Sequence, residues 1–197
     1  SKEPVKDFSG GKGISCNAGR TMKRSARRNL QRYKLRRENL IEILKKHGFI
    51  NDETILSENG NRTTFETYRL RAKAATDEIS LQEFARVLLM INKKRGYKSS
   101  RKAKSTEEGQ LIDGMEVARQ LYDNNLTPGQ FSLNLLKQGK KYLPDFYRSD
   151  LQAEFDRVWN FQKQYYSDIL TDSLKEELRG RNKTQSWTIC ANPFNIV

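Results

Sequence analysis

A dense run of basic residues between positions 20 and 37 is the feature of this sequence best suited to chemistry. Nine of the eighteen residues there are Lys or Arg, seven of them Arg, and none is acidic. Five recur every fourth residue: Arg20, Arg24, Arg28, Arg32 and Arg36. On an α-helix such a row winds by about 40° per step, with side chains about 6 Å apart along the axis. Because a guanidinium can hold phosphate oxygens with two hydrogen bonds, this spacing predicts a ridge that contacts nucleic-acid phosphates.

A solvent-facing helix is the alternative interpretation of the same run. Such helices usually interleave Glu with Lys or Arg, because like charges four residues apart repel each other. The absence of acidic residues between positions 20 and 37 therefore favours a polyanionic partner, and nucleic acid is the one we expect.

A second basic block covers residues 93–104, which hold seven Lys or Arg and no acid. Within it, Gly96 allows a close backbone approach, and Ser99 can donate to a phosphate. Tyr97 either stacks on a base or ribose or packs in a core. The residues that we predict to bind nucleic acid here are Lys94, Arg95, Tyr97, Ser99, Arg101 and Lys102.

The composition argues against several other classes of protein. The chain has 197 residues, with 37 Lys and Arg against 24 Asp and Glu, a net charge of +13. No apolar run approaches the roughly 18 residues of a membrane span. Cys16, Cys190 and the single histidine, His47, fall short of the about four ligands of a structural zinc site. We therefore expect no metal site, no membrane association and no catalytic constellation.

The elements that must position these residues are predicted to be helices. From Arg20 to about Lys46 there is no Pro or Gly, and Gly48 is a natural helix stop. Apolar residues recur at helical spacing only in the second half of this segment: Leu30, Tyr33, Leu40, Ile41 and Leu44. Its first half is polar all round, and such a helix needs a partner other than a hydrophobic core.

Further helices are indicated by capping signals and apolar periodicity. Three are expected at about 65–75, 105–123 and 171–179. Three more helices are expected to begin at capping signals: Ser80–Glu83, Thr127–Gln130 and Ser149–Gln152. Nothing alternates with period two for long, so the predicted class is all-α. The predicted organisation is a flexible lead-in (1–19), an arginine-rich helix (20–50), a helical domain (51–179) and an irregular tail (180–197).

Three segments, in this order, resemble a known family. Residues 24–49, RSARRNLQRYKLRRENLIEILKKHGF, are similar to the arginine-rich bridge helix of type II CRISPR-associated, RNA-guided DNA endonucleases, the Cas nine family. Residues 68–102, YRLRAKAATDEISLQEFARVLLMINKKRGYKSSRK, resemble the recognition-lobe signature of that family. Residues 144–166, PDFYRSDLQAEFDRVWNFQKQYY, resemble a later segment of its smaller, type II-C members.

The resemblance implies roles for individual residues. The guide RNA seed would be contacted by Arg20, Lys23, Arg24, Arg27, Arg28, Arg32, Arg36 and Arg37, with Tyr68 and Arg71 beside it. The block from Lys94 to Lys102 would face the duplex of crRNA repeat and tracrRNA anti-repeat. Asn29 and Tyr33 stand where members often carry Arg or polar residues, so the seed-facing stripe would be thinner here.

The function that follows is a guide-RNA-binding module of an antiviral, RNA-guided DNA endonuclease, without catalysis of its own. The RuvC and HNH residues of the family, and the Mg²⁺ implied for its full-length nuclease, would lie outside this chain. The implied partners are crRNA, tracrRNA, the target DNA strand and the rest of the nuclease, with the chain a monomer in the bacterial cytoplasm. Two alternatives remain: a stand-alone basic DNA- or RNA-binding protein, and a scaffold that binds an acidic protein.

Overall fold

The computed structural model describes residues 7–9, 12–14, 16–51, 61–93 and 114–179. Within them the chain forms seven helices: α1 (Cys16–Lys46), α2 (Asn61–Lys73), α3 (Leu81–Lys93), α4 (Gly114–Asp123), α5 (Pro128–Lys137), α6 (Arg148–Lys163) and α7 (Asp172–Arg179). Two short strands, β1 (Asp7–Ser9) and β2 (Lys12–Ile14), pair as an antiparallel hairpin. The predicted all-α class is confirmed, with this hairpin as a small addition.

Helix α1 is longer at its start than the sequence predicted, and it ends where expected. It begins at Cys16, ahead of Arg20. At its other end Gly48 has φ +75°, the Phe49 N–H donates to the Leu44 carbonyl at 2.9 Å, and the Gly48 N–H donates to that of Lys45 at 3.1 Å. These two bonds form the Schellman motif that closes a helix through a left-handed glycine.

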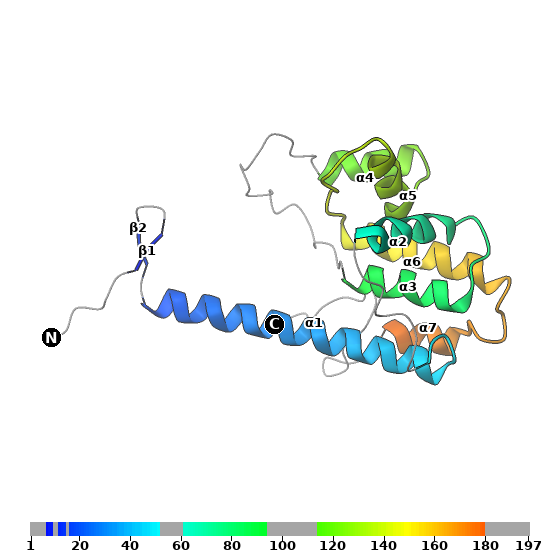
Figure 1. Ribbon diagram of the computed structural model, residues 1–197, viewed down its shortest axis with the longest axis horizontal. Helices are drawn as coiled ribbons and strands as arrows, with labels where there is room; N and C mark the ends of the chain where they lie inside the picture. Colours follow the sequence, from blue (N-terminus) through cyan, green and yellow to red (C-terminus); the bar gives the residue numbers. More distant parts are fainter. Residues whose placement is uncertain (1–6, 10–11, 15, 52–60, 94–113, 180–197) are drawn as a thin grey trace.

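Only the second half of α1 belongs to the core. Leu40 and Leu44 are buried, and α1 packs there against α3 and α7. The first half projects away from the other helices (Figure 1), and the side chains of residues 20–32 are exposed. Leu30 fits the apolar spacing of α1, but its side chain is 55% exposed because it precedes the part of α1 that packs against the other helices.

The main core is an aromatic and aliphatic cluster between α1, α2, α3, α6 and α7. Phe84 lies at its centre, with its ring centroid 6.0 Å from that of Phe49 and 6.1 Å from that of Trp159. The ring centroid of Phe155 lies 5.7 Å from that of Trp159. The apolar periodicity predicted after Ser80 and after Ser149 is confirmed by the burial of Phe84, Leu88 and Ile91 in α3 and of Leu151, Phe155 and Val158 in α6.

A smaller cluster joins α4, α5 and the start of α6, and it contains Val117, Leu121, Phe131, Phe146 and Leu151. Phe131 and Phe146 meet edge to face at 6.3 Å between centroids, a favoured aromatic geometry. Together the two clusters form one lobe, from which α1 projects (Figure 1).

Two of the predicted capping boxes are confirmed. The Glu83 N–H donates to Ser80 Oγ at 3.2 Å, and the Ser80 N–H donates to Glu83 Oε2 at 2.9 Å. Thr127 and Gln130 make the same reciprocal pair at the start of α5. The box predicted at Ser149 is wrong, since α6 begins at Arg148. Its N-terminal acceptor is Asp150, whose Oδ2 receives the Tyr147 N–H at 3.2 Å.

Candidate nucleic-acid interface

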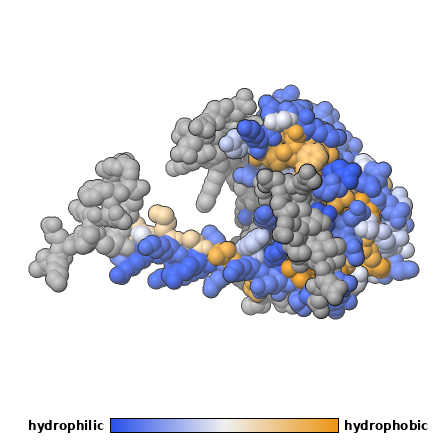
Figure 2. All heavy atoms as spheres, viewed as in Figure 1, coloured by the Kyte–Doolittle hydropathy of each residue, from blue (hydrophilic) through white to orange (hydrophobic). Residues whose placement is uncertain are grey.

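The free half of α1 presents the predicted arginine ridge to solvent. Arg20, Arg24, Arg28 and Arg32 are all exposed, as are Lys23 and Arg27 beside them. Figure 2 shows this part of α1 as a continuous hydrophilic surface along one side. The helix contains no acidic residue before Glu38. The ridge is therefore a row of cations, and the free half of α1 contains no acidic residue to balance their charge.

The last arginine of the ridge is buried. Arg36 is 7% exposed, although it continues the four-residue spacing of the other four. The reason is the winding of the row, which by this point has turned about 160° from Arg20 and meets the lobe. Burial lowers the pKa of the Arg36 guanidinium, while Tyr33 raises it and Arg32 lowers it. Arg37 is half-buried, so the predicted contacts divide into an exposed set and a set at the edge of the lobe.

An apolar side runs along the free half of α1, away from the ridge. Met22 is 64% exposed and lies eighteen residues, or five turns, before Leu40, so it falls on the same side of the helix as the core. Leu30 is close to that side as well, and Figure 2 shows pale and orange atoms along this part of α1. The helix thus separates a cationic side from an apolar one along its free half.

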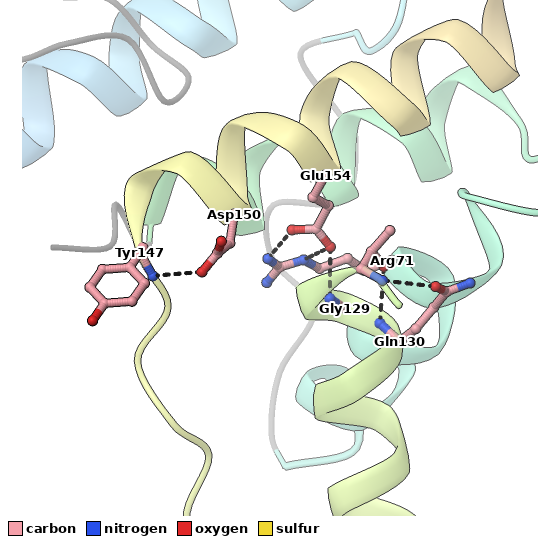
Figure 3. Close-up of polar contacts among 7 residues, drawn as sticks. Arg71, Gly129, Gln130, Tyr147, Asp150 and Glu154 are labelled. Carbon is pink, nitrogen blue, oxygen red and sulfur yellow. Dashed lines mark hydrogen bonds and ion pairs between the residues drawn. The ribbon is translucent and has the colours of Figure 1, made fainter. Parts of the chain in front are cut away.

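Arg71 lies inside the lobe, where it is paired with a glutamate (Figure 3). Its Nε donates to Glu154 Oε1 at 2.9 Å, and its Nη2 donates to Glu154 Oε2. The side chains of Arg71 and Glu154 are 2% and 0% exposed. A buried guanidinium is tolerated when a carboxylate pairs with it and the remaining polar atoms are hydrogen-bonded, and this pair joins α2 to α6.

Gly129 completes the same network from α5. Its N–H donates to Glu154 Oε1 at 2.7 Å. A Cβ at this position would lie 2.6 Å from Arg71 Cγ and 2.7 Å from Glu154 Oε1, distances that real Cβ atoms do not adopt. Only a glycine lets α5 approach the ion pair closely enough to donate to it. The sequence signal for this network is weak, because Arg71 and Glu154 are 83 residues apart.

The other predicted seed neighbour, Tyr68, is also buried, at 4% exposed. Burial raises the pKa of its phenol; Arg71 lowers it, and Glu154 and Asp145 raise it. Tyr68 and Arg71 therefore lie together in the lobe, apart from the exposed ridge, and their contact with RNA stays a prediction. The second predicted set, Lys94, Arg95, Tyr97, Ser99, Arg101 and Lys102, lies outside the described residues.

A polar cluster fastens the end of α1 to α7. Glu177 Oε1 accepts from Lys46 Nζ at 2.8 Å, and Glu177 Oε2 lies 2.9 Å from His47 Nε2. The hydrogen bond from Lys46 holds the pKa of the Glu177 carboxyl below its usual range; burial opposes this, and His47 lowers the pKa further. The single histidine thus contacts α7 at the C-terminal end of α1. This contact helps to fix the orientation of α1 relative to the lobe.

The described part of the chain contains no group of three or more His, Cys, Asp and Glu side chains that could hold a metal ion. Across the same residues, no helix has both the length and the apolar character needed to cross a membrane.

A curated protein is similar in sequence to most of this chain. No protein-family model matches it. The sequence is similar to the CRISPR-associated endonuclease Cas9 of Campylobacter jejuni, with 28% identity over 173 residues. The alignment covers 85% of this chain and 17% of that protein, so the chain corresponds to a minor part of the relative's length.

Solved structures of Cas9 proteins share the fold. A cryo-EM structure of an St1Cas9–sgRNA–tDNA59-ntPAM complex matches with a TM-score of 0.65 at 28% identity, over 85% of this chain and 21% of that one. A crystal structure of Streptococcus thermophilus Cas9 in complex with AGGA PAM matches with a TM-score of 0.59 at 26% identity, over 85% of this chain and 15% of that one. Both comparisons confirm the resemblance found in the sequence.

Proposed function

Because this chain is related over most of its length to the type II endonuclease Cas9, we propose that it is the guide-RNA-binding module of an RNA-guided DNA endonuclease. The observation that carries this proposal is the exposed arginine ridge on the free half of α1. Four guanidinium groups follow each other at steps of about 6 Å, a spacing close to that of phosphates along an RNA strand. Solved structures that match this chain include complexes with sgRNA.

The work of the ridge is to order the guide before it pairs. Arg20, Arg24, Arg28 and Arg32 hold successive phosphates of the seed, so part of the conformational entropy of the RNA is lost before target DNA arrives. Contacts to phosphates position a strand but do not read its bases. The target sequence is therefore read by base pairing with the guide, and this chain contributes affinity and geometry.

The lobe supplies the fixed support for this helix. Leu40 and Leu44 seat the second half of α1 in the core, and the cluster around Glu177 fixes its end. The ridge thereby keeps one direction relative to the lobe. We further propose that target DNA and the remainder of a nuclease chain are partners, that catalysis and its Mg²⁺ belong to that remainder, and that the protein acts as a monomer in the bacterial cytoplasm.

Salt-dependent RNA binding tests the proposal. Fluorescence anisotropy would compare a crRNA–tracrRNA hybrid with plain RNA and DNA duplexes, for the wild type and for an Arg24/Arg28/Arg32→Ala triple variant. Each phosphate contact contributes about 0.7–0.9 to the slope of log K against log salt, so the triple variant should lose about 2–3 units of slope. The hybrid should bind more tightly than either duplex.

The matched control removes three cations from the lobe instead, with Arg69, Lys73 and Arg119 replaced by Ala; all three are exposed. An equal loss of slope in this control would reject the ridge as the binding surface. If all nucleic acids bind alike, the chain is a general nucleic-acid binder. If a polyglutamate peptide displaces the hybrid at low concentration, the partner is an acidic protein.

A further inference from the structure

The loop between α5 and α6 carries a second exposed group of cations, outside the ridge. Lys140 and Lys141 are exposed there, next to Tyr142, whose side chain is 85% exposed. A tyrosine that exposed is not held by packing, and its ring offers an apolar face to solvent. Two lysines beside an exposed aromatic ring are the groups with which proteins bind a nucleic-acid strand.

The backbone holds this group in a defined position at its start. Gly139 has φ +77°, the Lys140 N–H donates to the Leu135 carbonyl at 3.0 Å, and the Gly139 N–H donates to that of Leu136 at 3.0 Å. These bonds form a complete Schellman motif at the end of α5. The backbone conformation at Lys140 is therefore fixed relative to α5.

The other end of the loop is fixed by the smaller core cluster. Phe146 is buried against Phe131, and the Tyr147 N–H donates to Asp150 Oδ2. Pro144 restricts the backbone between these points. The short stretch from Lys140 to Tyr142 thus lies between two anchored ends, so little conformational entropy remains to be lost when a ligand binds.

Charge favours the RNA that the ridge is proposed to hold. The sequence from Lys137 to Pro144 contains no acidic residue, and the next acid, Asp145, acts electrostatically on the buried Tyr68. The loop ends where α6 begins, so it belongs to the lobe that supports α1.

We propose that Lys140, Lys141 and Tyr142 form a second RNA contact, which binds a single-stranded segment. The two ammonium groups contact neighbouring phosphates, and the ring of Tyr142 stacks on one base. An unpaired base is required because only unstacked bases expose their faces to an aromatic side chain. The inference rests on the proposed function, since the RNA is the one held by α1.

Two variants of the full chain separate the two kinds of contact. Lys140→Ala/Lys141→Ala should reduce the salt slope for a single-stranded RNA by about 1.4, because two phosphate contacts are lost. Tyr142→Ala should weaken single-stranded RNA binding by roughly 5- to 140-fold and leave the slope unchanged, as the loss of one stacked base predicts. Tyr142→Phe should bind like the wild type, because stacking needs the ring and not the hydroxyl.

Tyr122→Ala is the matched control, because Tyr122 is also 85% exposed but lies on α4. If Tyr142→Ala weakens binding no more than Tyr122→Ala does, or weakens duplex RNA equally, the inference is wrong. If the Arg24/Arg28/Arg32→Ala variant loses salt slope but the loop variants bind RNA like the wild type, the loop contact is wrong and the role proposed for the ridge stands. The reverse result would support the loop contact and overturn the role proposed for the ridge.

Discussion

Removing the Glu154 carboxylate is expected to destabilise the lobe strongly. Both of its oxygens are in use: Oε1 accepts from Arg71 Nε at 2.9 Å and from the Gly129 N–H at 2.7 Å, and Oε2 accepts from Arg71 Nη2. Its side chain has no exposed surface, so bulk water does not reach the site to replace the lost acceptor. Glu154→Leu therefore leaves a buried guanidinium without its carboxylate and a buried N–H without its acceptor.

The expected cost follows from these two losses. Removing one partner of a buried ion pair costs about 3–5 kcal/mol, and an unsatisfied backbone N–H costs about 1–3 kcal/mol more. A whole domain is stable by about 5–15 kcal/mol, so Glu154→Leu should bring the lobe close to unfolding. The double variant Arg71→Met/Glu154→Leu removes the guanidinium as well, and only the loss at Gly129 remains, about 1–3 kcal/mol.

Urea unfolding followed by far-UV circular dichroism would measure these differences for the wild type, both single variants and the double variant. The double variant should be more stable than Glu154→Leu by at least about 2 kcal/mol. A loss below about 1 kcal/mol for Glu154→Leu, or a double variant less stable than both singles, would refute the reasoning.

The same double variant also tests the predicted RNA contact of Arg71. It retains the fold but lacks the guanidinium, so stability and RNA contact are separated. If Arg71 contacts the guide, the double variant should lose RNA affinity although it is folded. An unchanged affinity would show that Arg71 acts only within the lobe.

Three further predictions follow from the same contacts. Gly129→Ala should destabilise the lobe by about 1–3 kcal/mol in urea unfolding, because its Cβ would lie 2.6 Å from Arg71 Cγ. The hydrogen bond from Lys46 lowers the pKa of the Glu177 carboxyl. Its contribution to stability is therefore present above the ordinary glutamate pKa range and is lost as pH falls through the lowered pKa. In Glu177→Gln, the free energy of unfolding measured in urea should fall less steeply as the pH is lowered. Hydrogen exchange of residues 20–32 should be fast without RNA and slow with it, because these side chains are exposed and the helix there lacks tertiary support. Full protection of these amides in the free protein would contradict this.

Local sequence patterns predicted much of the secondary structure. The capping boxes at Ser80 and Thr127 and the glycine stop at Gly48 were all found where the sequence placed them. These signals involve residues within four or five positions of each other, so the chain itself brings them together. Where a cap was predicted wrongly, at Ser149, the neighbouring Asp150 competed for the same role and bound the Tyr147 N–H.

The burial of individual residues was less predictable. Leu30 fits the apolar spacing of α1 but is exposed, and Arg36 fits the arginine spacing but is buried. Periodicity shows which side of a helix a residue occupies, but not how far along that helix the core extends. The extent of the core depends on where α3 and α7 lie against α1.

The sequence by itself determined the helical class, the arginine ridge and the family resemblance, because each depends on residue types and spacings within short segments of the chain. Only the tertiary structure decided that the ridge exposes its first four arginines, and that Arg71 is paired with Glu154 beneath Gly129. That pairing requires α2, α5 and α6 to approach each other. Their approach is set by packing of side chains far apart in the sequence, and no local pattern records it.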